Sequence, residues 1–242
     1  MYWILVPFRS DSLGDRFRQL SEFLRYGEAL RRLFEVQIII IEQVHGKPFN
    51  RGKLLNVGLQ IISKYVNPAR DWICFHDVDL LPTNPRDYLT SSLDASASAS
   101  LDEIIHVAWP WQKYKYVNYI GGILSVRWTH VERTNGFPNE AWGWGGEDDV
   151  FFDRLKLNCR FTLTRPPCTP EHKCVDLEDS IEHTLVVHTF KSKTTMTKTD
   201  KSALLRHLRA HPEDGVRNVM ATTRLETLRI LNKWTSMYTV TI

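Results

Sequence analysis

Three short apolar runs, separated by two segments of helical periodicity, limit the fold more than any other feature of the sequence. The runs Trp3–Phe8, Val36–Ile41 and Trp72–Phe75 have the length and the β-branched or aromatic content of buried strands. Between them, Asp11–Leu33 and Leu54–Tyr65 carry apolar side chains at helical spacing. This alternating order predicts an α/β fold with a mostly parallel central sheet and helices on both faces.

The rest of the chain adds shorter elements to this core. We expect strands at Ile104–Trp109, Gly122–Val126 and Tyr238–Ile242, a helix at Asp148–Leu155 and another helix within 191–209. The low-complexity stretch Thr90–Ser100 is expected to be a surface loop. No internal repeat and no linker divides the 242 residues, which predicts a single domain.

Composition excludes several classes of protein. Hydrophobic residues make up 43% of the chain and charged residues 24%, which argues against disorder, collagen-like repeats and coiled coils. The net charge of +3 is too small to indicate binding of a nucleic-acid polymer by bulk electrostatics. No apolar run approaches the length of a membrane span, and residues 1–7 are interpreted as a first strand rather than a signal peptide.

The four cysteines leave three alternatives open. Cys168 and Cys174 flank His172 in a proline-rich loop, whereas Cys74 and Cys159 lie elsewhere. A zinc site would need a fourth ligand and prefers a shorter cysteine spacing. A local disulfide and free thiols are the other interpretations.

An Asp-Val-Asp motif follows directly on the third apolar run. Because side chains alternate along a strand, we expect Asp77 and Asp79 to point the same way, with Val78 the other way, so that the two carboxylates repel each other. A bound cation relieves that repulsion, and oxygen ligands with an added imidazole favour Mn²⁺. Such an ion can neutralise a diphosphate leaving group at the ligand-binding edge of the sheet. The alternative is a solvated turn in which one aspartate caps the next segment.

The most unusual stretch of the chain is Trp142–Asp149. Its three glycines allow backbone conformations that other residues avoid, so the loop can move and carry Trp144 over a site. Three consecutive acids, Glu147, Asp148 and Asp149, then open the predicted helix, where one of them can act as a general base. The alternative is an acidic helix start with a tryptophan in the core.

Together these motifs resemble the β-1,4-galactosyltransferase family, which are inverting glycosyltransferases with the GT-A nucleotide-sugar fold (glycosyltransferase family 7). The similar segments, in chain order, are Val6–Arg9, Phe49–Gly58, Asp77–Asp79, Tyr119–Gly122, Asn135–Asn139, Trp142–Asp149 and, more loosely, Asp214–Gly215 with the last strand. The match therefore runs along nearly the whole chain.

The resemblance implies a role for each matching residue. Donor and nucleotide binding falls to Pro7, Phe8, Arg9, Phe49, Arg51, Asp77, Val78, Tyr119, Gly122 and Trp144. Acceptor binding falls to Gly145, Gly146, Glu147, Asp148 and Asp149, with Asp148 as the catalytic base beside Glu147. Mn²⁺ is the implied cofactor, held by Asp79 and His188. Residues 1–130 then serve mainly the nucleotide sugar and the metal, and 131–242 mainly the acceptor and the catalytic loop.

The chain departs from the family pattern at the metal site. The family places Met-x-x-His or His-x-His in a later strand, and His188 matches one histidine of that pattern. The partner position falls on Leu185 or Val186, neither of which can bind a metal. His183 has the wrong strand parity unless a bulge redirects it. A lone histidine on a strand is otherwise a core residue.

The resemblance therefore implies a metal-dependent, inverting transfer of galactose from UDP-galactose to a hydroxyl of a glycan or glycoconjugate. The donor sugar is inferred from Tyr119, because a tyrosine at this position goes with galactose in the family. The acceptor is xylose or N-acetylglucosamine: the Asp-Val-Asp segment resembles the xylose branch, whereas Gly146 resembles the other. Alternatives are a transferase for UDP-N-acetylgalactosamine or UDP-glucuronate, and a carbohydrate-binding homologue with weak catalysis. A Golgi lumenal location is expected if an anchor was removed or belongs elsewhere, and otherwise a cytoplasmic viral or microbial enzyme.

Overall fold

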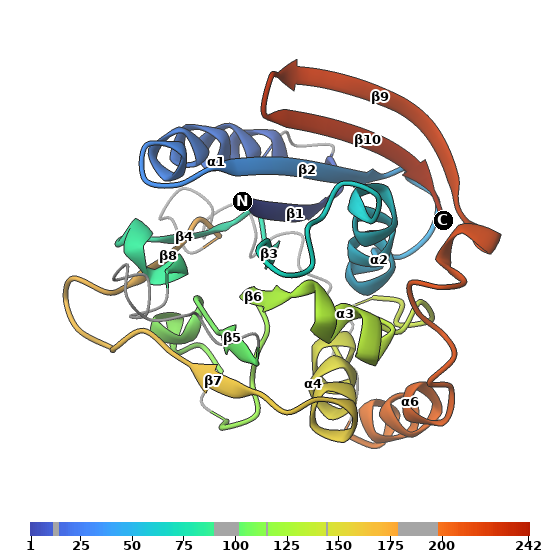
Figure 1. The fold of residues 1–242 in the computed structure, drawn as a ribbon. Helices are drawn as coiled ribbons and strands as arrows, with labels where there is room; N and C mark the ends of the chain where they lie inside the picture. Colours follow the sequence, from blue (N-terminus) through green and yellow to red (C-terminus); the bar gives the residue numbers. More distant parts are fainter. Residues whose placement is uncertain (12–14, 90–101, 115, 144, 179–197) are drawn as a thin grey trace.

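The computed structural model describes residues 1–11, 15–89, 102–114, 116–143, 145–178 and 198–242 (Figure 1). The predicted surface loop Thr90–Ser100 lies outside the described residues. So do Trp144, which the sequence assigns to the glycine-rich loop, and His188, which it assigns to the metal site. His183, whose strand parity argued against metal binding, lies outside the described residues as well.

An eight-stranded sheet runs through the molecule (Figure 1). In spatial order its strands are β7 (Thr162–Thr164), β5 (Glu103–Ile105), β6 (Ile123–Arg127), β3 (Trp72–His76), β1 (Tyr2–Phe8), β2 (Val36–Gln43), β10 (Thr235–Thr241) and β9 (Arg224–Asn232). The central strands β3, β1, β2 and β10 are all parallel, whereas β6 and β9 run antiparallel to β3 and β10. The mostly parallel α/β sheet predicted from the sequence is confirmed.

Helices cover both faces of this sheet because its strands alternate their side chains between two cores. Along β1, Ile4 and Val6 join the core beneath α1 (Asp15–Arg31). Trp3 and Leu5 join the core on the other face, beneath α2 (Arg51–Ile62). The remaining helices of the described chain that concern the site are α3 (Trp128–Thr134), α4 (Glu147–Asn158) and α6 (Lys198–Ala210). Figure 1 shows α6 beside α4, at the end of the molecule away from β9.

Two further strands and three short helical turns lie outside the main sheet and the α-helices. β4 (Leu80–Pro82) pairs with β8 (Cys174–Asp176) in a small antiparallel sheet next to the end of β3. Single 3₁₀ turns occupy Pro85–Tyr88, Trp109–Trp111 and Val219–Thr222. Among the described residues, no helix is long and apolar enough to cross a membrane.

Two local predictions are wrong. The strand expected at Ile104–Trp109 ends at Ile105, because the chain turns at residues 107–108 and continues into a 3₁₀ turn in which Pro110, which has no backbone N–H, is accommodated. Asp77 and Asp79 lie in a turn between β3 and β4 rather than on a strand, so side-chain alternation does not place them. Strands β4, β7, β8 and β9 were not expected, since three of them have only three residues and β9 is exposed throughout.

The cysteines are free thiols in this structure. Cys168 is exposed and Cys174 is part-buried, with no disulfide between them. His172 instead places Nδ1 2.5 Å from Oδ1 of Asp87. The local disulfide considered from the sequence is not formed, and the described residues contain no group of three side chains that could hold a zinc ion.

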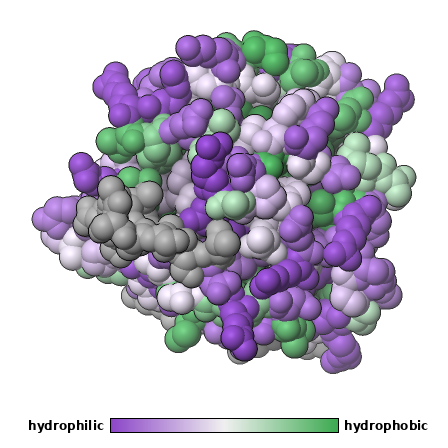
Figure 2. All heavy atoms as spheres, in the orientation of Figure 1, coloured by the Kyte–Doolittle hydropathy of each residue, from purple (hydrophilic) through white to green (hydrophobic). Residues whose placement is uncertain are grey.

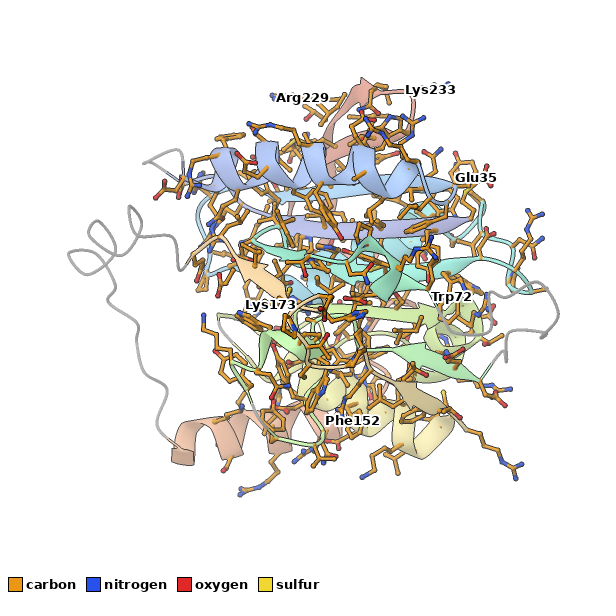
Figure 3. The ribbon with its side chains drawn as sticks, turned by 90° about the vertical axis from the view of Figure 1, so that its left-hand side faces the viewer. Glu35, Trp72, Phe152, Lys173, Arg229 and Lys233 are labelled. Carbon is orange, nitrogen blue, oxygen red and sulfur yellow. The ribbon has the colours of Figure 1, made fainter. Side chains whose placement is uncertain are left out.

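β9 forms the outer edge of the described sheet. All nine of its residues are exposed, including Leu225, Leu228, Ile230 and Leu231. Figure 2 shows hydrophobic side chains among hydrophilic ones along the upper edge of the molecule, where Figure 1 places β9. In Figure 3, Arg229 of this strand points away from the body of the molecule.

Candidate active site

A cavity of about 730 Å³ opens where β1 and β3 end. It lies at the carboxyl edge of the parallel strands, which is where open α/β sheets bind ligands. Of the residues to which the sequence assigns a role, it is lined by Pro7, Phe8, Arg9, Phe49, Arg51, Asp77, Val78, Asp79, Tyr119, Gly122, Gly145, Gly146, Glu147 and Asp148. Segments far apart in the sequence thus meet in one cavity.

Arg51, the first residue of α2, contacts both acidic motifs. Its Nε lies 2.6 Å from Oδ1 of Asp77 and its Nη1 lies 3.4 Å from Oε1 of Glu147. Asn50 fixes this helix start, because its side chain accepts a hydrogen bond from the Lys53 N–H. Burial disfavours the charged guanidinium, but Asp77 and Glu147 outweigh it, so the pKa of Arg51 is raised above its ordinary value. Arg51 therefore stays positively charged inside the cavity.

The turn after β3 presents two carboxylates to the cavity. Asp79 is the more buried of the two, and burial together with the charge of Asp77 raises the pKa of Asp79 to about 7. Arg16 of α1 offsets part of that charge, with Nη1 2.9 Å from Oδ2 of Asp79. The turn is thus a place where an added cation would be stabilised.

Glu147 and Asp148 begin α4, where the helix dipole favours negative charge. Burial, followed by the neighbouring Asp148, raises the pKa of Glu147 to about 7. Burial likewise raises the pKa of Asp148. The preceding glycines Gly145 and Gly146 have φ values of +86° and +99°, a left-handed conformation that other residues rarely adopt. This backbone turns the helix start toward the cavity.

Asp149 lies off the cavity lining. Its carboxylate accepts a hydrogen bond from the Tyr116 hydroxyl at 3.1 Å and lies 3.2 Å from Nζ of Lys201. The structure thus brings Glu147 and Asp148 to the cavity and holds the third acid beside α6.

Tyr119 and the glycines after it form the wall next to Arg51, whose Nη2 donates to the Gly122 carbonyl at 3.4 Å. A Cβ atom on Gly121 would lie 2.5 Å from Oδ2 of Asp148 and 2.7 Å from Cε2 of Tyr119. Asp148 and Tyr119 can therefore approach each other only across a glycine. His106 supports this segment from below, since its Nε2 donates to the Gly121 carbonyl at 2.9 Å. Burial lowers the pKa of His106 to about 4, so the ring is neutral.

Several residues of the lining were missed from the sequence. They are Asp11, Arg16, Trp111, Lys113, Tyr114, Tyr116, Asp176, Glu178 and Lys201. Gly121 and Gly143 line the cavity too, and they lie inside segments that the sequence matched to the family without giving either glycine a role. The dense run of aromatic residues from Trp109 to Tyr119 is a signal that could have found the aromatic part of the wall. Arg16 and Glu178 carry no such local signal, because they meet across 162 residues.

Two protein-family models match the parts of the chain that form the cavity. The model described as the N-terminal region of glycosyl transferase group 7 matches residues 2–92, and the model described as the N-terminal domain of galactosyltransferase matches residues 105–178. β-1,4-galactosyltransferase 7 of Drosophila melanogaster is 40% identical over 167 residues, which are 67% of this chain and 47% of that protein. Human β-1,4-galactosyltransferase 5 is 34% identical over 168 residues, which are 67% of this chain and 39% of that protein. The chain spans less than half the length of these curated relatives.

Solved structures extend the similarity to the whole chain. The catalytic domain of Drosophila β-1,4-galactosyltransferase 7 in complex with xylobiose has a TM-score of 0.75 and 28% identity, covering 100% of this chain and 93% of that one. A mutant of the same enzyme in complex with manganese, UDP-Gal and xylobiose gives the same values. The fold is therefore the GT-A fold of nucleotide-sugar transferases. Within that class, the chain belongs to the β-1,4-galactosyltransferase family, glycosyltransferase family 7, as its motifs predicted.

Proposed function

We propose that the chain is a metal-dependent, inverting β-1,4-galactosyltransferase that moves galactose from UDP-galactose to a sugar hydroxyl. The observation that carries this proposal is the meeting of two acidic motifs in one cavity, with Arg51 between Asp77 and Glu147. An inverting transfer needs one base for the acceptor and one stabiliser for the leaving group. The motifs beginning at Asp77 and Glu147 divide these tasks.

The donor occupies the side of the cavity formed by β1 and α2. Phe8 and Phe49 supply flat apolar surfaces for the uracil base, and Pro7, Val78 and Gly122 complete the wall. Arg9 stacks over the Phe49 ring at 5.4 Å, so its guanidinium lies next to that surface. Arg9 and Arg51 offer the fork geometry that suits diphosphate oxygens. In this proposal Tyr119, which lines the same cavity, contacts the galactose of the donor.

The cation site fits a divalent ion such as Mn²⁺. Among the described residues, no three His, Cys, Asp or Glu side chains converge as a ready metal site. Asp79 nevertheless offers a hard oxygen ligand and already holds a cation, the Arg16 guanidinium, at 2.9 Å. In this proposal Asp79 and His188 hold Mn²⁺, which when bound stabilises the charge of the departing diphosphate.

The acceptor binds against the start of α4. Asp148 removes the proton of the attacking hydroxyl, and Glu147, Gly145 and Gly146 position the acceptor sugar. Asp149 acts on the acceptor indirectly, by holding the lining residues Tyr116 and Lys201. Burial favours this role, since a raised pKa makes the Asp148 carboxylate a stronger base. Trp144, by its place in the sequence, closes over the donor and excludes water.

A xylose-type acceptor is favoured over N-acetylglucosamine by the relatives. The Drosophila enzyme with 40% identity is the one whose catalytic domain was solved with xylobiose. We further propose that 1–242 acts as one catalytic domain, with 1–130 serving mainly donor and metal and 131–242 mainly the acceptor. Arg51 and Glu147, from the two parts, share one cavity.

The test is a UDP-release assay with Mn²⁺, a panel of UDP-sugars, and xyloside and N-acetylglucosaminide acceptors. UDP-galactose with a xyloside is expected to give the fastest turnover. Faster turnover with UDP-N-acetylgalactosamine or UDP-glucuronate would show that the proposed donor is wrong. Binding of the sugars without any UDP release would indicate a carbohydrate-binding protein instead of an enzyme.

The base is tested by Asp148→Asn. Transfer is expected to fall by about 10²–10⁴-fold, while UDP binding in the presence of Mn²⁺ stays nearly unchanged. Asp153→Asn, further along α4 and paired with Arg209 on the surface, is the matched control and should keep full activity. Loss of UDP binding together with transfer in Asp148→Asn would contradict a role confined to the acceptor.

A further inference from the structure

The cation site of the proposed function has one ligand fewer than its family pattern supplies. Leu185 and Val186 occupy the position where the pattern places a methionine or histidine, and neither can bind a metal. Of the two metal ligands that the resemblance implies, Asp79 and His188, only Asp79 lies in the described part of the chain. This inference rests on the proposed function, because it concerns the ion that Asp79 would hold.

The guanidinium of Arg16 lies between two carboxylates. Its Nη1 is 2.9 Å from Oδ2 of Asp79, and its Nη2 is 2.7 Å from Oε1 of Glu178. The three side chains are part-buried, with exposed fractions of 35% for Arg16, 17% for Asp79 and 22% for Glu178. The Gln19 side chain also accepts from Nη1 at 2.8 Å, which holds the guanidinium in this place.

The backbone holds the two acidic residues together independently of Arg16. The Leu177 N–H donates to the Asp79 carbonyl at 2.8 Å, so the segment after β8 is tied to the turn after β3. The Glu178 N–H donates in turn to Oδ1 of Asp176 at 2.9 Å. Asp79 and Glu178 would therefore remain neighbours if Arg16 moved away.

We propose that Glu178 is a ligand of the divalent cation, and that Arg16 takes the place of this cation when none is bound. A guanidinium between two carboxylates meets the same electrostatic need as a divalent ion between them. Its hydrogen bonds of 2.7 and 2.9 Å keep the carboxylates farther apart than ligand distances near 2.1 Å would. Because arginine does not lose its proton, the ion can enter only when the guanidinium leaves.

The experiment is a calorimetric titration of the full chain with Mn²⁺ alone, without nucleotide. Glu178→Gln keeps the shape of the side chain and removes its charge, so Mn²⁺ binding is expected to weaken by about tenfold or more. Glu178→Asp, which keeps the carboxylate, should restore part of the affinity. Glu171→Gln, an exposed glutamate seven positions earlier, is the matched control and should bind Mn²⁺ like the wild type.

Arg16→Gln tests the second half of the proposal. Removing the competing guanidinium is expected to tighten Mn²⁺ binding by about two- to fivefold. Thermal unfolding of each variant shows whether the fold is kept. Weaker Mn²⁺ binding in a folded Arg16→Gln variant would overturn the exchange of one cation for the other.

Asp79→Asn separates failure of this inference from failure of the proposed function. If Asp79→Asn abolishes Mn²⁺ binding and Glu178→Gln leaves it unchanged, Glu178 is not a ligand, and the metal site of the proposed function stands. If Asp79→Asn keeps wild-type Mn²⁺ binding, the metal site of the proposed function is itself wrong.

Discussion

Arg51 is the residue through which the two acidic motifs of the cavity are held together. It forms its closer contact with Asp77 and a longer one with Glu147, and its side chain is only 14% exposed. A buried arginine with two carboxylates keeps its charge and its orientation, which makes it a fixed electrostatic element in the cavity. Because it contacts both motifs, we expect a change in either one to alter the electrostatics of the other.

Gly121 sets how closely Asp148 and Tyr119 approach. Gly121→Ala would place a methyl group 2.5 Å from Oδ2 of Asp148, so that carboxylate must shift. Because a misplacement of about 1 Å can cost about a hundredfold in rate, we expect transfer to fall by about 10- to 100-fold. The thermal unfolding midpoint should change little, since the ends of two side chains can move. A Gly121→Ala variant with full activity would show that this approach is not needed.

The raised pKa of Glu147 predicts a pH dependence of stability. A carboxyl group whose pKa is raised on folding stabilises the protein fully below its unfolded value of 4.5, and this contribution is lost as the pH rises through about 7. The free energy of unfolding of the wild type therefore decreases between pH 5 and pH 8. In Glu147→Gln this decrease should be smaller, by about 3 kcal/mol at most. Denaturant titrations at pH 5 and pH 8 measure it.

The matched control for this pH effect is Glu28→Gln on the exposed side of α1. That variant should retain the wild-type difference between the two pH values. If Glu147→Gln also retains the wild-type difference in the free energy of unfolding between pH 5 and pH 8, the pH dependence does not come from Glu147. Asp79 has a pKa raised in the same direction, so some dependence on pH is expected to remain in Glu147→Gln.

At the scale of elements, β9 is the least protected part of the described fold. It is the last strand of the described sheet, with β10 as its neighbour on one side, and its exposed side chains include Leu225, Leu228 and Ile230. Natural sheets usually protect such an edge with charges, prolines or bulges, and β9 contains Arg224, Glu226 and Arg229 for this purpose. These charges alternate with the apolar residues rather than replace them.

Leu228→Lys is expected to reduce self-association at high protein concentration, because it places a charge in the middle of the exposed edge. The free energy of unfolding should stay within about 0.5 kcal/mol of wild type. Leu157→Lys, which adds the same charge at an exposed position of α4, is the matched control and should not reduce self-association. Light scattering across a concentration series distinguishes the two. Equal effects of both variants would assign the improvement to net charge.

Elements with a strong local pattern could be predicted from the sequence, and elements without one could not. The isoleucine run of β2 and the periodic α2 were found close to their observed bounds. β4, β7 and β8 are too short to show a period, and they form through pairing with distant strands. The helix after the glycine-rich loop was found, but Pro110 was not read as the end of a strand. Tertiary contacts decide the short strands, whereas the turn at Pro110 is a local effect.

The same distinction applies to the cavity. Phe49, Arg51, Asp77 and Glu147 belong to motifs with a recognisable chemistry, and the structure places all four in the lining. Glu178 was missed because only the fold brings it to Asp79. The sequence therefore identifies the side chains that belong to a recognisable motif. The residues that contact them from distant parts of the chain, such as Glu178, are found only in the fold.

At the scale of the whole molecule, Asn139 joins three distant segments. It is 4% exposed, and its side-chain carbonyl accepts from Asn56 of α2 at 2.9 Å. Its backbone N–H and its side-chain amide both donate to the Asp214 carboxylate at 2.7 Å. The loop before α4 is thereby fixed to the helix that carries Arg51 and to the segment that leads into β9 and β10.

Asp214→Ala is expected to destabilise the protein by about 3 kcal/mol, because it leaves buried donors of Asn139 without their charged acceptor. Activity should fall as well, since the loop before Glu147 loses an anchor. Glu213→Ala, at the exposed neighbouring position, is the control and should behave like wild type. Urea unfolding measures the difference. Equal stability of the two variants would show that this connection is dispensable.

The insertion of β10 between β2 and β9 has a consequence for how the protein is made. Thr239 of β10 donates to Glu42 of β2 across 197 residues, so β2 gains this neighbour only after most of the chain has left the ribosome. Until then the isoleucine-rich strand has an open backbone edge that can pair with another nascent chain. Such a long-range pairing also forms slowly. Slow synthesis at low temperature, or a chaperone that covers the edge of β2, should therefore raise the yield of folded protein.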